Sequence, residues 1–208
     1  MTDNEKLLEI IKAAAEEIEK QKDYLTELDQ PIGDSDHGIN MARGFAAVLQ
    51  KLDSLKGKDA GTVLKAVGMA LVSTVGGASG PLYGTAFMKA GAAVAGKTEI
   101  SMDDFLNLMD AAVAGVKMRG HAELEEATMI DAMVPALNAM KEAHAAGKST
   151  AEVLDAGVKA SWAGAEHTKG LVATKGRASY MGERGIGHQD PGATSFSFIL
   201  ETVAKAYR

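Results

Sequence analysis

Apolar residues recur at every third or fourth position over most of the chain, which is the spacing of one face of an α-helix. Period-two alternation, the pattern of a half-buried strand, is confined to residues 195–198 and is short. We therefore expect an all-α fold of about eight helices, whose inward positions fall within residues 7–18, 41–52, 63–71, 81–95, 105–116, 129–140, 153–162 and 192–207. No linker rich in proline, serine or charge interrupts this series, which predicts a single domain over residues 1–208.

Several of these helices begin at residues that favour helix N-termini. Asp3 is placed to cap the first helix. Ser101 is followed three positions later by Asp104, the spacing of a capping box, and Ser149 or Thr150 can start the seventh helix.

Composition excludes several classes of protein. Apolar residues make up 46% of the 208 residues, which is enough for a substantial core, and the absence of cysteine excludes disulfides and thiolate metal sites. The net charge of −6 argues against nucleic acid or an anionic membrane as a partner. With neither a long apolar run nor a signal-like N-terminus, the sequence predicts a soluble, cytoplasmic protein.

The most informative segment lies between the first two predicted helices. Asp29, Asp34 and Asp36 fall within eight residues, in a stretch that Pro31 and Gly33 keep out of regular helix. Each contact between two carboxylates at ~4 Å costs about 4 kcal/mol at an effective dielectric of ~20. Such a loop either stays open to water or binds cations, and carboxylate oxygens favour hard divalent ions, chiefly Mg²⁺. A solvated turn with an Asp helix cap is the alternative for this segment alone.

Three glycine-bearing breaks each precede a predicted helix, at residues 36–40, 76–84 and 182–195. Helix N-termini bind phosphate, and glycine lets the backbone approach a ligand closely. Known phosphate and calcium motifs do not match, because there is no G-x-x-x-x-G-K-[ST], the glycines after residue 182 have the wrong order for a dinucleotide site, and no bidentate Glu completes an EF-hand. The three breaks, one of them triply acidic, predict a site for phosphate plus metal.

Read in order, these segments resemble the nucleotide-binding L subunits of dihydroxyacetone kinases. The matching stretches are DQPIGDSDHGINM at 29–41, GGASGPLYG at 76–84, GRASYMGER at 176–184 and HQDPGA at 188–193. The resemblance covers nearly the whole chain. It implies a barrel of eight antiparallel helices, closed at one end and holding ADP with magnesium at the other.

The resemblance also implies a function. The 208 residues cover only the nucleotide domain, so the chain is similar to kinases with separate subunits that draw on the phosphoenolpyruvate phosphotransferase system. In that type ADP is a resident cofactor, converted transiently to ATP by a phosphohistidine carrier subunit. The phosphoryl group then passes to dihydroxyacetone on a K subunit, so the chain alone should be almost inactive. We also expect a homodimer, and a transcription regulator is a further partner that the family suggests.

Site residues follow from the same resemblance, position by position. Asp29, Asp34 and Asp36 are the implied magnesium ligands, and two ions would balance the roughly six negative charges of three carboxylates and a diphosphate. His37, which would hydrogen-bond phosphate, and Arg177 are the expected catalytic residues; a capping histidine and a solvated arginine are the alternatives. The expected cofactor-binding residues are His37, Gly38, Asn40, Ala78, Ser79, Gly120, Met129, Arg177, Asp190, Pro191 and Gly192.

One stretch departs from the family pattern. Where the family usually has Gly-Asp-Lys-Thr-Met, this chain has Glu125-Glu126-Ala127-Thr128-Met129. A lysine that could balance phosphate or metal-site charge is replaced by alanine, which puts the geometry at the adenosine and the identity of the sugar in question.

Three other functions remain open. The chain could be an L-type paralogue acting on another small ketose, a partner-independent metal phosphohydrolase, or a non-enzymatic regulatory binding subunit. Turnover without partner proteins would indicate the hydrolase, and normal complementation by a metal-site mutant would indicate the regulator.

Overall fold

The computed structural model describes residues 2–208 and places nine α-helices and three 3₁₀ helices within them. The α-helices are α1 (Asn4–Lys20), α2 (Lys22–Asp29), α3 (His37–Leu49), α4 (Ala60–Thr74), α5 (Ser79–Ala93), α6 (Met102–Gly120), α7 (Ile130–Ala145), α8 (Thr150–His167) and α9 (Pro191–Lys205). The 3₁₀ helices are η1 (Leu52–Leu55), η2 (Thr168–Gly170) and η3 (Arg177–Gly185). The all-α class predicted from the sequence is confirmed.

Two details differ from the sequence-based expectation. The short helix α2 was not predicted, and it continues α1 after a break at Gln21. The candidate strand at residues 195–198 is wrong, because these residues lie inside α9. The capping box of Ser101 and Asp104 is present at the start of α6.

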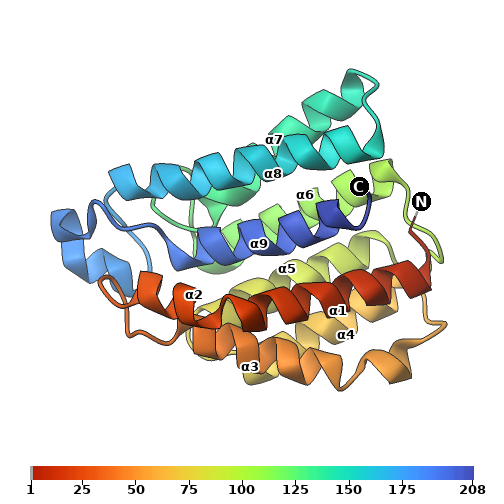
Figure 1. The fold of residues 1–208 in the computed structure, drawn as a ribbon, viewed down its shortest axis with the longest axis horizontal. Helices are drawn as coiled ribbons and strands as arrows, with labels where there is room; N and C mark the ends of the chain where they lie inside the picture. The colour runs from red at the N-terminus through yellow and green to blue at the C-terminus, as the bar shows by residue number, and fades with distance from the viewer. Residues whose placement is uncertain (1) are drawn as a thin grey trace.

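The helices form a closed ring, which Figure 1 shows from the side. α1 packs on α3, each helix from α3 to α8 packs on the next one along the chain, and α9 packs on both α8 and α1. This arrangement is compatible with the expected barrel. Large apolar side chains such as Ile18, Phe45 and Leu71 are almost fully buried between the helices. Because neighbouring helices run in opposite directions, alternate helices begin at the same end of the ring.

The end of the ring that holds both termini is closed by contacts between segments that are far apart in the sequence. Thr2 and Ile100 form an antiparallel bridge through backbone hydrogen bonds of 2.9 and 2.8 Å. The Thr2 hydroxyl also hydrogen-bonds the hydroxyl of Tyr207, whose ring lies 3.9 Å below the ammonium of Lys6. The opposite end, on the left of Figure 1, is formed by α2, η3 and the connecting loops.

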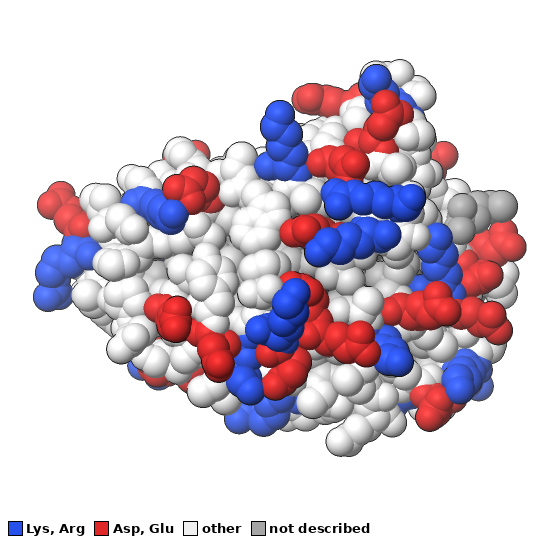
Figure 2. Space-filling model, in the orientation of Figure 1, with Lys and Arg blue, Asp and Glu red and all other residues white. Residues whose placement is uncertain are grey.

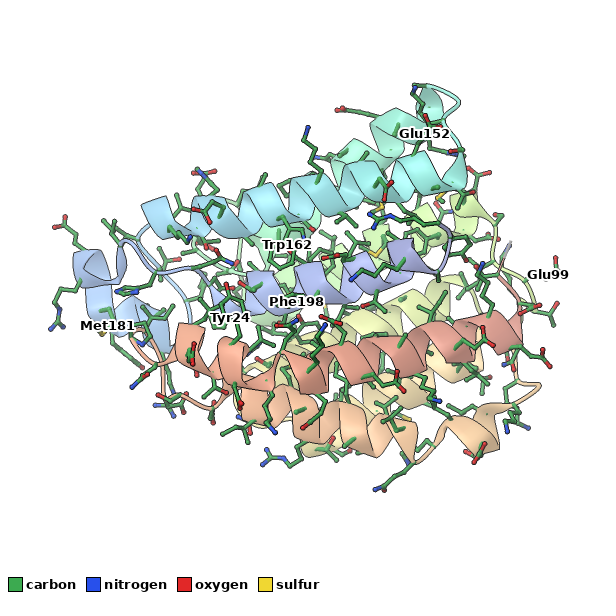
Figure 3. All side chains as sticks on the ribbon, in the orientation of Figure 1. Tyr24, Glu99, Glu152, Trp162, Met181 and Phe198 are labelled. Atoms are coloured by element: carbon green, nitrogen blue, oxygen red, sulfur yellow. The ribbon has the colours of Figure 1, made fainter. Side chains whose placement is uncertain are left out.

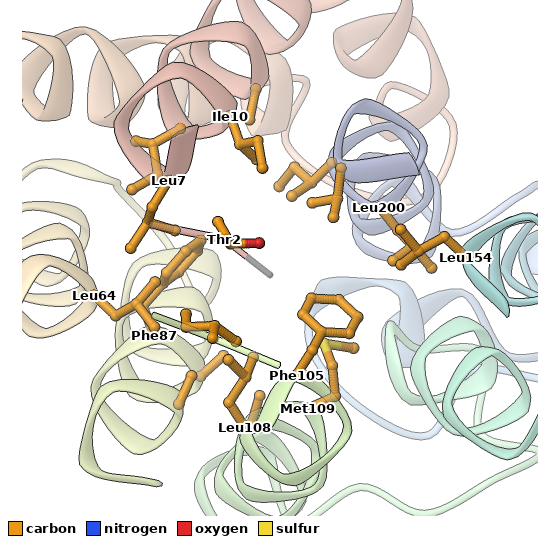
Figure 4. Close-up of a pocket in the computed structure, with 18 of the residues that line it drawn as sticks. Thr2, Leu7, Ile10, Leu64, Phe87, Phe105, Leu108, Met109, Leu154 and Leu200 are labelled. Carbon is orange, nitrogen blue, oxygen red and sulfur yellow. The ribbon is translucent and has the colours of Figure 1, made fainter. Parts of the chain in front are cut away.

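An apolar cavity of about 170 Å³ lies inside the ring. Leu7, Ile10, Phe87, Phe105 and Leu108 point into it from α1, α5 and α6 (Figure 4). Its wall also includes Tyr83 and Met129, which line the hollow at the open end as well. These two side chains therefore separate the interior of the ring from the open end.

Aromatic side chains connect three neighbouring helices on one face. The ring of Phe198 meets Trp162 at 4.9 Å and Tyr24 at 6.3 Å between centroids, both edge to face. Figure 3 shows the three side chains as a row across α8, α9 and α2. Such pairs contribute roughly 0.5–1.5 kcal/mol beyond the area that they bury.

Charged side chains of both signs are interspersed on the face shown in Figure 2, without an extended block of one sign. In the part of the chain that the structure describes, every helix is too short or too polar to cross a membrane.

Candidate functional site at the open end

The three aspartates of the loop between α2 and α3 come together at the open end. One carboxylate oxygen of each of Asp29, Asp34 and Asp36 lies within 4.8 Å of the other two. Asp29 is buried, Asp36 is half-buried and Asp34 is exposed. A cluster of hard oxygen donors at this spacing suits Mg²⁺ chemically, and one face of it is open to solvent.

Asp29 also holds the start of α3. Its Oδ2 accepts hydrogen bonds from the backbone N–H groups of Asp36 at 2.9 Å and His37 at 3.2 Å. Asp36 occupies the N-cap position but makes no capping bond with its own side chain, so its carboxylate stays free for a cation. The same loop therefore fixes the first turn of α3 and the carboxylate cluster.

Two glycines allow this close packing. A Cβ at Gly33 would lie 1.9 Å from Oδ1 of Asp29, so any side chain there would displace the carboxylate. A Cβ at Gly38 would lie 1.9 Å from the carbonyl oxygen of Lys22, where α3 crosses α2. Gly38 thus has a packing role in this structure.

The acidic cluster forms one side of a hollow of about 480 Å³. This volume is within the range of roughly 300–1,000 Å³ that is usual for small-molecule sites. Residues 76–79 and 81–83, the loop before α7 and the start of α9 form the other sides. With the exception of Gly38, all residues that the sequence predicts for the site line this one hollow: Asp29, Asp34, Asp36, His37, Asn40, Ala78, Ser79, Gly120, Met129, Arg177, Asp190, Pro191 and Gly192.

Helices α3, α5, α7 and α9 begin around this hollow, whereas α1, α4, α6 and α8 begin at the closed end. The helices that begin at the closed end are all capped by their own N-cap side chains: Asp3, Asp59, Ser101 and Ser149. The N-cap residues of α3, α5 and α7 make no such bond. Each helix N-terminus carries roughly half a positive charge. The open end therefore offers the partial charges that an anion such as phosphate requires.

His37, the first residue of α3, is held between two hydroxyl groups. Its Nδ1 lies 3.1 Å from Oγ of Ser79, and its Nε2 lies 3.0 Å from Oγ of Ser195. The imidazole is buried, and burial lowers its pKa to about 4 despite the opposing charge of Asp29. The ring is therefore neutral at pH 7.

Asp190 caps α9 at the edge of the hollow. Its Oδ2 accepts a hydrogen bond of 2.6 Å from the backbone N–H of Ala193. Burial, reinforced by the charges of Asp131 and Asp29, raises the pKa of Asp190 to about 7. The raised pKa reduces the negative charge that this carboxyl adds to the site near neutral pH.

Basic side chains approach the acidic cluster from the segments before and within η3. Nε of Arg177 lies 2.8 Å from Oδ2 of Asp34, and both side chains are partly exposed. Arg119 and Lys175 also line the hollow. Lys175 is paired at 3.3 Å with Glu126, in the stretch that departs from the family pattern.

That departing stretch has a strained backbone. Glu125 and Ala127 have φ angles of 68° and 54°, in the left-handed region that glycine adopts most easily. The buried carboxylate of Asp131 holds the loop by accepting the backbone N–H of Glu125 at 2.6 Å and of Thr128 at 2.8 Å. The loop is thus ordered without the glycine that the family usually has at position 125.

Sequence reasoning missed several residues of this end. Arg119 and Lys175 line the hollow, and Tyr83 and Ser195 extend the hydrogen bonding of His37. Lys175 directly precedes the GRASYMGER segment at 176–184, so its position in the sequence could have indicated that it lies at the site. His188, by contrast, is exposed, and its backbone N–H bonds the carbonyl of Gly185 at 3.3 Å.

Comparison with known proteins shows the family of this chain. Residues 31–205 match the DAK2 domain family, and the chain belongs to this family. It is 43% identical over 186 residues to the PEP-dependent dihydroxyacetone kinase, ADP-binding subunit DhaL, of Escherichia coli (strain K12), with 89% of each chain covered. It is 47% identical over 195 residues to the ADP-binding subunit DhaL of PEP-dependent dihydroxyacetone kinase 2 of Listeria innocua, covering 91% of this chain and 90% of that one. The resemblance drawn from the sequence is confirmed.

Solved structures show the same fold. The crystal structure of the dihydroxyacetone kinase of C. freundii in its native form superposes with a TM-score of 0.74 at 25% identity, covering 95% of this chain. This chain spans 34% of the length of that kinase. A structure of the same enzyme in complex with AMP-PNP and Mg²⁺ gives a TM-score of 0.73 at 24% identity.

Proposed function

We propose that this protein is the ADP-binding subunit of a phosphoenolpyruvate-dependent dihydroxyacetone kinase, a phosphotransferase that works with partner subunits. The observation that carries the proposal is one hollow that combines a three-carboxylate cluster with helix N-termini whose N-cap residues form no side-chain cap. The similarity to ADP-binding subunits over about 90% of the chain supports it.

The residues present fit Mg²⁺ and ADP. Asp29, Asp34 and Asp36 offer hard oxygen ligands, and we propose that they hold two Mg²⁺ ions. The first turn of α5, at Ala78 and Ser79, lies in the same hollow and would bind a phosphate. Gly120 and Met129 lie there as well and would contact the adenosine. When bound, Mg²⁺ offsets the charge that develops on the transferred phosphoryl group.

The residues of this chain would position the phosphoryl group and neutralise its charge, and none of them would bond to it covalently. Phosphoryl transfer depends mainly on in-line placement and charge stabilisation. His37 is neutral and can present one N–H or one lone pair at each ring nitrogen, so it serves as a hydrogen-bonding group and not as a cation. Arg177 carries the permanent positive charge near the cluster and would turn from Asp34 to the nucleotide.

The complete reaction requires other proteins. We propose a phosphohistidine carrier subunit as the donor to bound ADP, with ATP as the transient form, and a dihydroxyacetone-binding K subunit as the acceptor. A homodimer and contact with a transcription regulator belong to the same proposal. Neither nucleic acid nor a membrane is expected as a partner of a chain with a net charge of −6.

Native mass spectrometry of the purified protein tests the resident cofactor. The expected spectrum shows the intact chain with ADP and Mg²⁺ bound, and denaturation should release ADP. The Asp34→Ala variant should lose both ligands while remaining folded. Folded protein from Mg²⁺-containing buffer that carries no nucleotide would contradict the proposal.

Reconstitution tests the reaction itself. The protein should transfer phosphate to dihydroxyacetone only when the K subunit and the phosphocarrier are both present with phosphoenolpyruvate. Hydrolysis of small phosphate esters by the protein alone would favour a metal phosphohydrolase, and transfer to a different ketose would indicate a paralogue with another substrate.

A further inference from the structure

Four side chains form a buried row of hydrogen-bonding groups behind the hollow. In order they are Ser79, His37, Ser195 and Tyr83, and we name them the hydroxyl–imidazole chain. The successive contacts are 3.1 Å from Ser79 Oγ to His37 Nδ1, 3.0 Å from His37 Nε2 to Ser195 Oγ, and 2.7 Å from Ser195 Oγ to the Tyr83 hydroxyl. The row links the start of α5 to α9.

Ser79 and Tyr83, at the two ends of the hydroxyl–imidazole chain, both line the hollow, whereas Ser195 does not. Ser79 is half-buried and lines the hollow at the first position of α5. Ser195 is 0% exposed, and Tyr83 is 4% exposed with its ring against the apolar cavity. Water therefore has no ready access to replace either of these two buried hydroxyl groups.

A neutral imidazole has one N–H and one acceptor nitrogen. The hydrogen bonds along the hydroxyl–imidazole chain can therefore be donated in either of two directions, which we call its two polarities. If Nε2 carries the proton, it donates to Ser195, and Nδ1 then accepts the proton of Ser79, which turns away from the hollow. If Nδ1 carries the proton, it donates to Ser79 Oγ, and the Ser79 hydroxyl is free to donate into the hollow. The second polarity requires Ser195 to donate to Nε2.

An anion in the hollow favours the second polarity, because a phosphate oxygen accepts hydrogen bonds and offers none. The Ser195 hydroxyl then donates its single proton to Nε2 of His37, and the buried Oγ of Ser195 is left as an acceptor without a donor. The Tyr83 hydroxyl, at 2.7 Å, supplies it. The Gly192 carbonyl is the competing acceptor, because it lies 3.3 Å from the Tyr83 hydroxyl and 3.1 Å from Ser195 Oγ. These hydroxyl groups can donate to it in the first polarity, whereas in the second their protons go to Ser195 and to His37.

We propose that Ser195 and Tyr83 are positioning residues, which fix the Nδ1–H tautomer of His37 and thereby aim the Ser79 hydroxyl at a phosphate oxygen of the bound nucleotide. This inference rests on the proposed binding of ADP at the open end. It adds two residues that act on the nucleotide through His37 and Ser79.

The first test measures ADP affinity of the full-length protein in excess Mg²⁺ by calorimetry. Ser195→Ala should weaken ADP binding about tenfold, the effect of losing one directed hydrogen bond to a charged group. Ser197→Ala is the matched control, because Ser197 is also 0% exposed on α9 but donates to the Ala193 carbonyl at 3.0 Å, outside the chain. Its ADP affinity should equal that of the wild type.

The second test reads the tautomer of His37 directly, by long-range ¹H–¹⁵N correlation NMR of the imidazole. The wild type with Mg²⁺ and ADP should show a protonated Nδ1 and an unprotonated Nε2. Ser195→Ala should move the proton toward Nε2. Tyr83→Phe, which keeps the ring in the cavity wall, should give a mixture of both tautomers and a several-fold loss of affinity, and it decides the question if Ser195→Ala does not fold.

The outcomes separate the two proposals. Wild-type protein that binds no ADP in excess Mg²⁺ refutes the proposed function, and this inference with it. Wild-type protein that binds ADP while His37 is protonated at Nε2, or at both nitrogens, refutes the positioning role alone. ADP affinities that are equal in wild type, Ser195→Ala and Tyr83→Phe refute it as well.

Discussion

Asp29 has two roles, which a comparison of two substitutions can separate. Its buried carboxylate accepts the N–H groups of Asp36 and His37 at the start of α3 and belongs to the acidic cluster. Asp29→Ala removes both roles. Asp34→Ala is the control, because Asp34 is exposed and its partner in the structure is Arg177.

The expected loss of stability in Asp29→Ala follows from the contacts of Asp29. A hydrogen bond to a charged group contributes about 1.5–3 kcal/mol, and the second bond of Asp29, at 3.2 Å, is long, so the pair contributes roughly 3 kcal/mol. Relief of repulsion with Asp36 returns between ~1 kcal/mol at the dielectric of water and ~4 kcal/mol at a dielectric of ~20, and the partial solvent exposure of Asp36 places it near the lower value. Without metal, Asp29→Ala should therefore destabilise the protein by roughly 2 kcal/mol, or roughly 4–8 °C in Tm for a chain of this size. Asp34→Ala should change stability by less than about 0.5 kcal/mol.

Thermal unfolding in EDTA and then in a Mg²⁺ titration measures both effects. Mg²⁺ at 100 times its Kd should stabilise the wild type by about 2.7 kcal/mol and should stabilise neither variant. Equal Tm values for Asp29→Ala and wild type in EDTA would refute the capping role. Mg²⁺-dependent stabilisation that persists in both variants would refute the metal site.

Three further predictions concern neighbouring residues. Gly33→Ala should weaken Mg²⁺ binding at least tenfold in a calorimetric titration, because its Cβ would lie 1.9 Å from Oδ1 of Asp29, whereas Gly170→Ala, with nothing within 4 Å, should not; equal losses would contradict this. Arg177→Gln should weaken ADP binding but leave Mg²⁺ binding equal or tighter, since Asp34 loses its 2.8 Å partner, and a parallel loss of both ligands would argue against it. The pKa of His37 falls from 6.5 to about 4 on folding, so the folded state binds fewer protons and its stability is lost as pH falls from 6.5 toward 4. In ligand-free urea unfolding, the stability of the wild type relative to His37→Gln should fall by about 3 kcal/mol over that window, and a pH-independent difference would exclude the shift.

Most of the fold could be predicted because its helices bury one periodic face. The exception is α2, whose eight residues bury only Leu25 and Asp29 and therefore carry little apolar pattern. The candidate strand failed for a different reason. Ser195 and Ser197, which looked like the polar side of a strand, are buried in α9 and satisfy their hydroxyl groups within the fold.

The site could be predicted where its residues are neighbours in sequence. Asp29, Asp34 and Asp36 share one loop, so their spacing already indicated a metal cluster. The hydroxyl–imidazole chain could not be predicted in this way, because His37 and Ser195 are 158 positions apart and Tyr83 and Ser195 are 112 apart. Only the closure of α9 against the first helices brings them together.

The unequal capping of the two ends has a consequence for how the protein holds together. Each helix that starts beside the termini is capped by the side chain of its own N-cap residue, whereas the N-cap residue of α5 is Ala78, whose methyl group cannot accept a hydrogen bond. A bound phosphate would take the place of the missing N-cap side chain, and such a cap contributes roughly 0.5–2 kcal/mol. The nucleotide would then be a structural part of the mature fold, and hydrogen exchange at the first turn of α5 should slow when it is present.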